Sequence, residues 1–441
     1  VRMVRKAHQV VEGDIALVIG GFHLGDASAN EMQNILVNFR SLEVRKVSPT
    51  HCTGAEAIAR FATEYGDDYV QGGVGRVIVV GMASAQAVSA AAERWPTESW
   101  PASNPEEQGM DADLLAKMME TIREQEYAID SVTIIRHGNL VADATVYPFE
   151  ADTKHVIHSC TKSIVSALIG IAIEQGHIEG IDQPVVELLP GRNVAETDGG
   201  KEMLTLEHLL TMSTGLACRD SYLYSWAGLN EMRQSEDWVQ FMLDLPPVHA
   251  PGTYFEYCNG ASFLLSAILQ DATGMSASAY ATEQLFGPLG IDDVDWPSNP
   301  QGITIGWGEL RMKPRDAAKF GYLYLRDGWW DGDQIVHSSW VRASTREQIQ
   351  GTLQDGYGYQ WWVDDSGYYM ALGYAGQFIF VVPEMDLVVV FGSDLGDRDF
   401  YVPQELLTGY IIPAARSTTP LPAKPDGASR LEAAIHVLAG P

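Results

Sequence analysis

The chain has 441 residues, which is long enough for two or three domains and a large buried core. Hydrophobic residues make up 46% of it and charged residues 20%, an ordinary balance for a globular protein. The formal net charge is −29 and the sequence pI is about 4.6, which disfavours binding to nucleic acid or to anionic membrane surfaces. We therefore expect neither a nucleic-acid nor a membrane partner.

No segment approaches the ~18 consecutive apolar residues of a membrane helix. The longest candidate, residues 164–173, is interrupted by Ser166 and Gly170. Glu12 and Asp14 fall where the apolar core of an export signal would lie, so a cytoplasmic location is favoured. The chain begins with Val, which leaves open an upstream piece.

The four cysteines are too few and too scattered for a disulfide framework or a C-x-x-C metal site. Two of them, Cys160 and Cys258, lie inside the motifs described below, and we expect both to be packed free thiols.

Residues 1–82 alternate between predicted strands and helices, the rhythm of a small α/β unit. The predicted strands cover residues 15–19, 44–47 and 76–80, and the predicted helices cover residues 30–39 and 55–65. Residues 83–105 are first rich in Ala and Ser and then in Pro and Ser, and we interpret them as a linker.

Residues 106–441 form the second predicted domain. A helix at 111–124 precedes a hairpin whose strands, 131–135 and 140–146, flank His137-Gly138-Asn139. A helix follows at 159–174, and residues 182–345 are mainly helical. The last predicted strands cover residues 359–363, 368–372, 377–382 and 387–391. Strands at both ends with helices between them predict an α+β fold: an antiparallel sheet closed by both chain ends, with an inserted helical domain.

Ser159 and Lys162 form the only S-x-x-K of the chain. On a helix this spacing places a hydroxyl and an amine one turn apart on one face. A serine needs a base to become a nucleophile, and a buried lysine with a lowered pKa can serve without a histidine.

Tyr257 and Asn259 form the only Y-x-N. Tyr257 is an alternative base if an adjacent ammonium stabilises its phenolate, so the identity of the base stays open between Tyr257 and Lys162. Asn259 can hold Lys162 and orient a substrate carbonyl.

A tetrahedral intermediate also needs an oxyanion hole. The backbone N–H of Ser159, at a helix N-terminus, is one candidate donor. The N–H of Gln377, on a strand edge after Gly376, is the second, and the glycine allows substrate to approach the backbone. Tyr374 on the same edge is expected to line the pocket.

Together these motifs resemble the serine β-lactamase and penicillin-binding-protein superfamily, with its S-x-x-K, Y-x-N and K-T-G elements. The resemblance covers residues 106–391 and points to the class C-like branch, which includes esterases and 6-aminohexanoate-dimer hydrolase. It implies that Ser159 is the nucleophile, Lys162 the proton-transfer partner, Tyr257 the general acid/base and Asn259 a substrate-orienting residue. Further segments carry it: residues 212–216, 251–252, 255–256 and 357–362.

The chain departs from that pattern at one position. Tyr374 stands where the K-T-G lysine is expected, and Ala375 replaces the threonine. A lysine there would bind the carboxylate of a β-lactam or peptide, so its absence favours an ester or small amide substrate.

Residues around the motifs are expected to be structural or to line the pocket. His158 precedes the nucleophile and is expected to point away from it. Two aromatic groups are each expected to supply both core and pocket walls: Tyr222, Tyr224 and Trp226, and Trp361 and Trp362.

The N-terminal segment has a second resemblance, to the C-terminal part of metallo-β-lactamase-fold hydrolases. Residues 20–24, 49–54 and 73–75 carry it, and the histidine matching His51 binds metal in that family. The H-x-H-x-D-H cluster that completes such a site is absent from this sequence. We expect His51 to be a cap or turn residue, with no metal and no cofactor.

The leading hypothesis is a serine hydrolase that cleaves carboxylic esters or small amides through an acyl-enzyme on Ser159. A β-lactamase or D,D-peptidase would share the fold, and so would a non-catalytic penicillin-binding-like sensor. A metal-dependent hydrolase run by the N-terminal piece is the third alternative. The natural substrate and the oligomeric state stay open.

Overall fold

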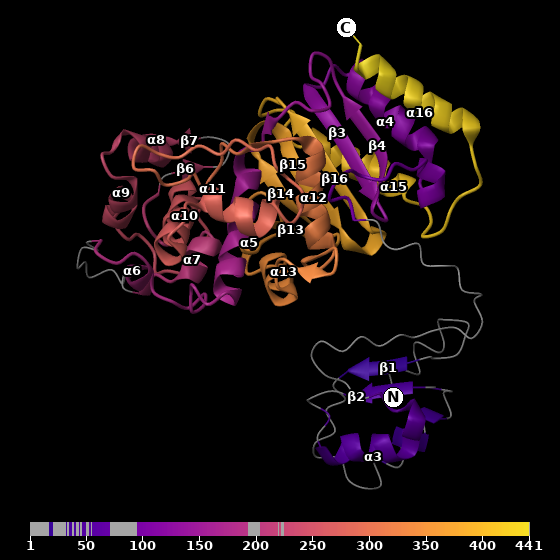
Figure 1. Ribbon diagram of the computed structural model, residues 1–441, viewed down its shortest axis with the longest axis horizontal. Helices are drawn as coiled ribbons and strands as arrows, with labels where there is room; N and C mark the ends of the chain where they lie inside the picture. Colours follow the sequence, from indigo (N-terminus) through magenta and orange to yellow (C-terminus); the bar gives the residue numbers. More distant parts are fainter. Residues whose placement is uncertain are drawn as a thin grey trace. The chain divides into compact units, whose positions relative to one another are not determined.

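In the computed structural model the chain divides into two compact units, Val1–Ala92 and Glu93–Pro441 (Figure 1). The structure describes residues 17–20, 46–49 and 55–70 of the smaller unit, with isolated positions between 32 and 53. Of the larger unit it describes residues 95–192, 203–218, 220–221 and 225–440. Among the described residues, no helix combines the length and apolarity needed to cross a membrane.

The smaller unit contains a parallel strand pair and a helix. β1 (Leu17–Gly20) pairs with β2 (Lys46–Pro49), and α3 (Ala55–Tyr65) follows. Val47 and Phe61 are fully buried in its own small core, which agrees with the predicted α/β rhythm. Of the residues that carry the second resemblance, the structure describes Gly20, Pro49 and Thr53, whereas His51 and positions 73–75 lie outside the described residues, as does the predicted strand at 76–80.

The larger unit is built on an eight-stranded sheet in the order β11-β12-β13-β14-β15-β16-β3-β4, antiparallel throughout. β16 lies beside β3, with Val389 opposite Ile134, so strands from the two ends of the domain close the sheet as predicted. The strands are β3 (Ile129–Arg136), β4 (Asn139–Thr145), β11 (Ile349–Gln350), β12 (Gly356–Tyr357), β13 (Trp362–Asp364), β14 (Tyr368–Gly373), β15 (Gln377–Val382) and β16 (Leu387–Ser393).

Helices cover this sheet. β14, β15 and β16 are buried at every position, as expected for strands with both faces covered. α12 (Pro314–Leu325) packs on β15 and β16 through Gly321, where a Cβ would lie 2.7 Å from Val388 and 2.9 Å from Ile379. In Figure 1 the sheet lies between the inserted helical region and the pair α4 and α16.

The pair α4 (Ala112–Glu124) and α16 (Pro425–Leu438) joins the two ends of the domain. The Asp111 side chain caps α4 by accepting from the Asp113 N–H at 3.0 Å. Arg430 of α16 is paired with Glu120 of α4 at 2.6 Å. No helix is predicted after residue 391, so α16 is found only in the structure.

The inserted region is mainly helical, as predicted. Its helices are α5 (Thr161–Glu174), α6 (Val185–Leu188), α7 (Leu206–Leu210), α8 (Ala227–Gln234), α9 (Trp238–Asp244), α10 (Asn259–Thr273), α11 (Ala277–Ala281) and α13 (Ser338–Ser344). Short strand pairs lie among them: β5 (His155–Val156) with β8 (Arg311–Met312), β6 (Asp220–Ser221) with β7 (Ser225–Trp226), and β9 (Trp329–Trp330) with β10 (Asp333–Gln334). Two further short helices, α14 (Val402–Leu406) and α15 (Ile412–Ala414), follow the sheet.

Residues 95–105, which composition assigns to a linker, belong to the larger unit and pack against the rest of it. The Trp95 ring lies 5.4 Å from the Trp330 ring, and Trp100 Nε1 donates to the carbonyl oxygen of Arg315 at 3.0 Å. The buried Lys319 donates to the carbonyl oxygen of Thr97 at 3.1 Å. These contacts place the start of the larger unit at or before Trp95.

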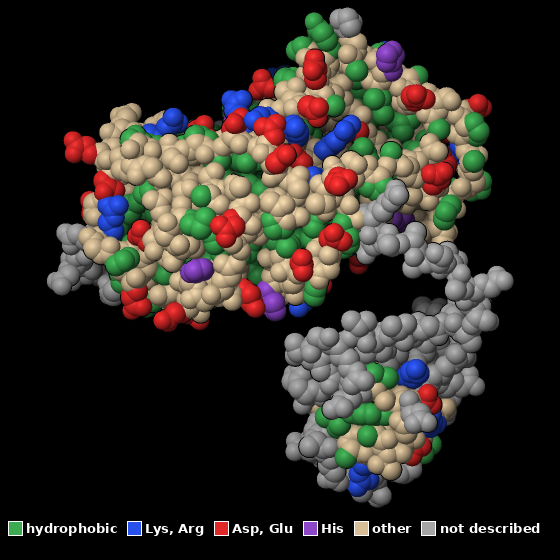
Figure 2. Space-filling model, viewed as in Figure 1, with side chains coloured by type: hydrophobic (Ala, Val, Ile, Leu, Met, Phe, Trp, Pro, Cys, Tyr) green, Lys and Arg blue, Asp and Glu red, His purple; other side chains and the backbone are tan. Residues whose placement is uncertain are grey.

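The charged side chains are mixed on the face shown in Figure 2. Among the side chains that the structure describes on that face, Lys and Arg lie interspersed with Asp and Glu.

Candidate active site

Ser159 lies in a tight turn at the start of a buried helix. The 3-10 turn η4 (His158–Cys160) leads into α5, and the φ angle of His158 is +46°, a left-handed value that non-glycine residues rarely adopt. Gly373 in β14 admits this turn, because a Cβ there would lie 2.5 Å from the carbonyl oxygen of Ile157. Strained backbone of this kind clusters at functional sites, and here it presents Ser159 at the edge of the sheet.

Lys162 follows one helical turn later and is only 1% exposed. Its Nζ lies 3.0 Å from Ser159 Oγ, 2.9 Å from Asn259 Oδ1 and 2.7 Å from the carbonyl oxygen of Trp307. Burial lowers the pKa of Lys162 well below its ordinary value, and the negative charge of Asp220 opposes that effect. The site therefore favours a neutral amine, the form that can accept a proton.

Tyr257 lies against both of these residues. Its side chain interacts with that of Ser159, and Lys162 Nζ lies 4.9 Å from the centre of its ring. The ring also stacks on Trp362 with centroids 6.0 Å apart. Burial raises the pKa of Tyr257 above its ordinary value, more than its interaction with Ser159 lowers it. The phenol therefore keeps its proton near neutral pH.

Asn259, the first residue of α10, links Lys162 to a buried carboxylate. Its Oδ1 accepts from Lys162, and its Nδ2 donates to Asp220 Oδ2 at 3.1 Å. Both ends of this amide are thus bonded within the protein. Sequence reasoning missed Asp220, because an aspartate 39 residues before Asn259 carries no local signal.

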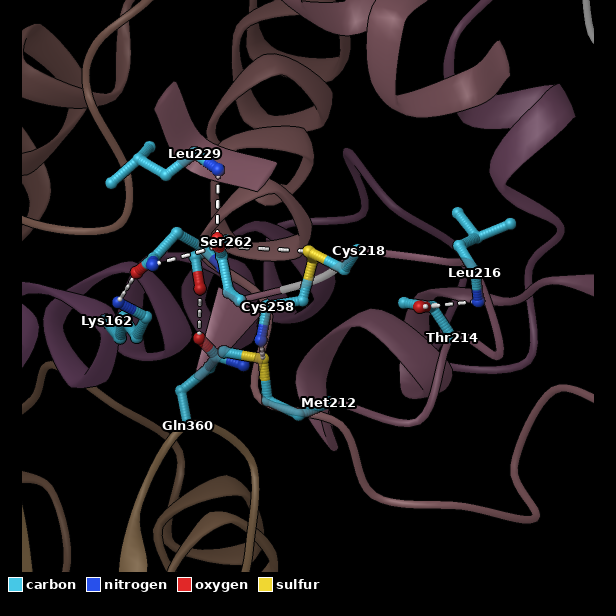
Figure 3. Close-up of a disulfide and its surroundings, with 11 residues drawn as sticks. Lys162, Met212, Thr214, Leu216, Cys218, Leu229, Cys258, Ser262 and Gln360 are labelled. Atoms are coloured by element: carbon cyan, nitrogen blue, oxygen red, sulfur yellow. Dashed lines mark hydrogen bonds between the residues drawn. A yellow bond between two sulfur atoms is a disulfide. The ribbon is translucent and has the colours of Figure 1, made fainter. Parts of the chain in front are cut away.

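A disulfide lies beside these residues and corrects the prediction of free thiols. Cys258, between Tyr257 and Asn259, is bonded to Cys218, with Cα atoms 5.8 Å apart (Figure 3). The two cysteines are separated by 40 residues, so only the packing of their segments brings them together. Cys160 is the free cysteine among the described residues and is buried.

The strand edge after β14 brings Tyr374 and Gln377 close to the nucleophile turn. The Cys160 thiol lies 3.5 Å from the carbonyl oxygen of Gln377, and the Gln377 side-chain amide donates to the Ser393 carbonyl. Gly376 has φ of +84°, and a Cβ there would lie 2.7 Å from Leu395 Cδ1. The left-handed backbone and the close packing against Leu395 are sufficient reasons for a glycine at position 376. The glycine is therefore not independent evidence for the approach of a substrate.

A cavity of about 490 Å³ opens at Ser159. The His158 ring makes an edge contact with Tyr374 at 5.7 Å, and Tyr374 makes another with Trp226 at 5.4 Å, which forms an aromatic wall. His158 was expected to point away from the site, but the strained turn places it in this wall. The cavity is lined by His158, Ser159, Trp226, Leu229, Asn230, Arg233, Trp307, Gly308, Glu309 and Tyr374.

The two predicted aromatic groups are divided by the structure. Trp226 lines the cavity, whereas Trp361 is fully buried in the core and Trp362 supports Tyr257 from behind. Tyr222 and Tyr224 lie outside the described residues. Within the described part of the chain, no group of three or more His, Cys, Asp or Glu side chains is placed to hold a metal ion.

An antiparallel sheet closed by both ends of a domain, with an inserted helical region and a Ser–Lys–Tyr cluster at the sheet edge, defines the β-lactamase-like class of hydrolases. Residues 111–402, well over half of the chain, match the family model described as Beta-lactamase. The chain therefore belongs to the Beta-lactamase family.

Its relatives include a dimer hydrolase and an esterase. The chain is 23% identical over 341 residues to 6-aminohexanoate-dimer hydrolase of Paenarthrobacter ureafaciens, covering 71% of this chain and 86% of that protein. It is 25% identical over 242 residues to Esterase EstB of Burkholderia gladioli, covering 50% of this chain and 59% of EstB. The solved structure of EstCE1, a hydrolase with promiscuous acyltransferase activity, matches with a TM-score of 0.58 and 17% identity, covering 68% of this chain and 99% of that one. The structural match supports the fold alone.

Proposed function

We propose that this protein is a serine hydrolase that cleaves carboxylic esters or small amides through an acyl-enzyme on Ser159. The observation that carries the proposal is the 3.0 Å contact between Ser159 Oγ, which lines the cavity, and the buried amine of Lys162, which itself lies 4.9 Å from the ring of the buried Tyr257.

The surroundings of Lys162 favour it over Tyr257 as the base. A neutral amine has two N–H bonds and one lone pair. When the Asn259 oxygen and the Trp307 carbonyl accept these two N–H bonds, the lone pair of the neutral amine faces Ser159 Oγ, 3.0 Å away, and can take its proton. Tyr257 has its pKa raised by burial and is more suited to donate a proton than to accept one.

Acylation then proceeds in two stages. Ser159 Oγ bonds to the acyl carbon, its proton moves to Lys162 Nζ, and the carbonyl electrons move onto oxygen. In the proposal, the backbone N–H groups of Ser159 and Gln377 hold that oxyanion. The bond to the leaving alcohol or amine breaks as it takes a proton from Tyr257, and the Lys162 ammonium restores the phenol. Water reverses the sequence, releasing the acid and free Ser159.

The cavity favours substrates without a carboxylate next to the scissile bond. Tyr374 supplies no cation at the strand edge. Arg233, which lines the cavity, lies 3.9 Å from Glu309, so its charge is balanced within the same wall. The names of the relatives, an esterase and a dimer hydrolase, agree with an ester or small amide.

A fluorophosphonate probe with intact-mass detection tests the nucleophile. Wild-type protein should gain one probe mass and hydrolyse p-nitrophenyl acetate, whereas Ser159→Ala should do neither. Ser163→Ala is the matched control: its hydroxyl is buried in the same helix and donates to the Gln360 carbonyl at 2.7 Å, so labelling should persist. Labelling of Ser159→Ala at another serine would refute the assignment.

The same assays separate the alternatives. A wild type that prefers nitrocefin to the ester is a β-lactamase, and one that is labelled but never turns over is a sensor. Loss of ester turnover on treatment with EDTA would support the metal-dependent reading instead.

A further inference from the structure

Asp220 is a buried carboxylate that lies one amide group away from Lys162. It is 8% exposed and accepts three backbone or side-chain N–H bonds: from Leu229 N at 2.9 Å, Asn259 N at 3.2 Å and Asn259 Nδ2 at 3.1 Å. None of the three family motifs contains this residue.

Asp220 decides which way the Asn259 amide faces. A carboxylate has only acceptor atoms, so the amide nitrogen of Asn259 must face Asp220. The amide oxygen then points to Lys162 Nζ at 2.9 Å. Turning the amide over would put an NH2 group against the lysine and a carbonyl against the carboxylate, and would lose both hydrogen bonds.

We propose that Asp220 is a positioning residue for the hydrolytic reaction, which orients Asn259 toward Lys162 and places a negative charge one amide away from the base. This inference rests on the proposed function of Ser159 and Lys162. Asp220 touches neither the substrate cavity nor the nucleophile, so it acts through Asn259.

Asp220 also binds the start of α8, the helix that forms one wall of the cavity. Leu229 lies in the first turn of α8, whose Asn230 and Arg233 line the cavity. Gly228 allows this helix to approach, since a Cβ there would lie 1.7 Å from the Cys218 carbonyl oxygen. Figure 3 shows Leu229 and Lys162 near the disulfide between Cys218 and Cys258.

The charge of Asp220 also affects the pKa of Lys162. Burial lowers the pKa of Lys162, and the charge of Asp220 raises it. The other titratable groups near Lys162 are Tyr257 on the loop before α10, and His158 and Cys160 in the turn η4. Removal of the Asp220 charge therefore moves the Lys162 pKa further down, and the pH at which the base becomes neutral falls with it.

The test compares Asp220→Asn, Asp220→Glu and Asp316→Asn with the wild type. Asp316 is the matched control, because it is also a mostly buried carboxylate but is paired with Lys319 at 3.3 Å, away from the cavity. Two quantities are measured: kcat and KM for p-nitrophenyl acetate across pH, and the titration midpoint of Lys162 by NMR of ¹⁵N-lysine-labelled protein, assigned with Lys162→Met.

Asp220→Asn should lower kcat about 10²-fold with a smaller change in KM, as expected for a misplaced reacting group. Its Lys162 midpoint and the acid limb of kcat/KM should both move to lower pH. Asp220→Glu keeps the charge, so its midpoint should stay close to wild type and part of kcat should return. Asp316→Asn should lower the melting temperature and leave both pH measurements unchanged.

An Asp220→Asn protein with the wild-type Lys162 midpoint and unchanged kcat would overturn the inference. So would a loss that falls only in KM. If Asp220→Asn does not fold, Asp220→Glu and Asn259→Ala are compared instead. The inference is overturned if the Lys162 midpoint moves as far from the wild-type value in Asp220→Glu, which keeps the charge, as in Asn259→Ala, which lacks the amide. The NMR midpoint needs no turnover, so a wild type that lacks Ser159 labelling refutes the proposed function while the positioning of Lys162 is still measured.

Discussion

Lys162 and Lys319 are both buried in the larger unit, yet the groups around their amines differ. Lys319 Nζ donates to the carbonyl oxygens of Gly290 and Thr97 and lies 3.3 Å from an Asp316 carboxylate oxygen. Lys162 Nζ contacts three uncharged oxygens, and its nearest carboxylate, Asp220, is reached only through the Asn259 amide.

The difference shows what turns a buried lysine into a candidate base. A carboxylate in direct contact favours the ammonium and forms an ion pair, from which neither partner can be removed without leaving a buried charge. With neutral acceptors in contact and the charge one amide further away, burial dominates and the pKa of Lys162 falls. Burial is therefore common to the two lysines, and the distance to the nearest carboxylate is what distinguishes the candidate base from the other.

The comparison is tested most strongly at Lys162 itself. Lys162→Met should lower kcat for p-nitrophenyl acetate by about 10²–10⁴-fold, the usual contribution of a positioned acid or base. Methionine keeps the buried stem, so the fold should persist. Tyr257→Phe should lower kcat as well, and the double variant should lose far less than the product of the two losses. Full activity in Lys162→Met would show that Lys162 is not the base.

Removing the N-terminal contacts of the Lys319 region should have the next largest effect. A chain starting at Glu93 keeps Trp95, Thr97 and Trp100, whereas one starting at Ala102 loses all three and their contacts with Trp330, Lys319 and Arg315. We expect the shorter chain to lose at least about 3 kcal/mol of unfolding free energy, the usual cost of deleting one buried tryptophan. Denaturant unfolding of both chains gives the difference, and equal stability would mean that residues 93–101 are a linker after all.

Lys319→Met should lower stability without affecting catalysis. It leaves the Asp316 carboxylate without its direct partner, and breaking a buried pair costs about 3–5 kcal/mol. Thermal unfolding should register the loss, while kcat of the remaining folded protein stays at the wild-type value. The double variant Lys319→Met/Asp316→Leu should recover part of the stability, because it removes both charges. A fall in kcat with unchanged stability in Lys319→Met would show that Lys319 affects catalysis and that the two lysines do not differ in the way proposed.

Tyr374→Lys should have the smallest effect on ester hydrolysis, because the Tyr374 side chain lines the wall and takes no part in proton transfer. The new ammonium should improve the reaction with β-lactams that carry a carboxylate, since a partly desolvated ion pair is stronger than a hydrogen bond from a phenol. Values of kcat/KM for nitrocefin and for p-nitrophenyl acetate decide this. A variant that loses the ester activity and gains nothing with nitrocefin would contradict it.

Local sequence was sufficient for the main elements of the fold. Period-2 and apolar patterns predicted the hairpin β3–β4 and the strands β14, β15 and β16 within a few residues, and their placement at the two ends of the domain predicted the closed sheet. The predicted helix at 159–174 is divided, because its first residues form the turn η4 that bears Ser159. Composition alone assigned residues 95–105 to a linker, since the partners of Trp95 and Trp100 lie more than 200 residues away in sequence.

The features of the candidate active site also divide into those that a local pattern predicts and those that depend on tertiary contacts. The sequence by itself determined the Ser159–Lys162 spacing, because a helical turn brings residues three apart onto one face, and it indicated Tyr257 and Asn259 as partners. Only the tertiary structure decided that Asn259 is held by Asp220, that Cys258 is bonded to Cys218, and that His158 and Trp226 share a cavity wall with Tyr374. Each of these contacts joins segments that no local pattern relates, so the packing of the helical region against the sheet edge is what creates them.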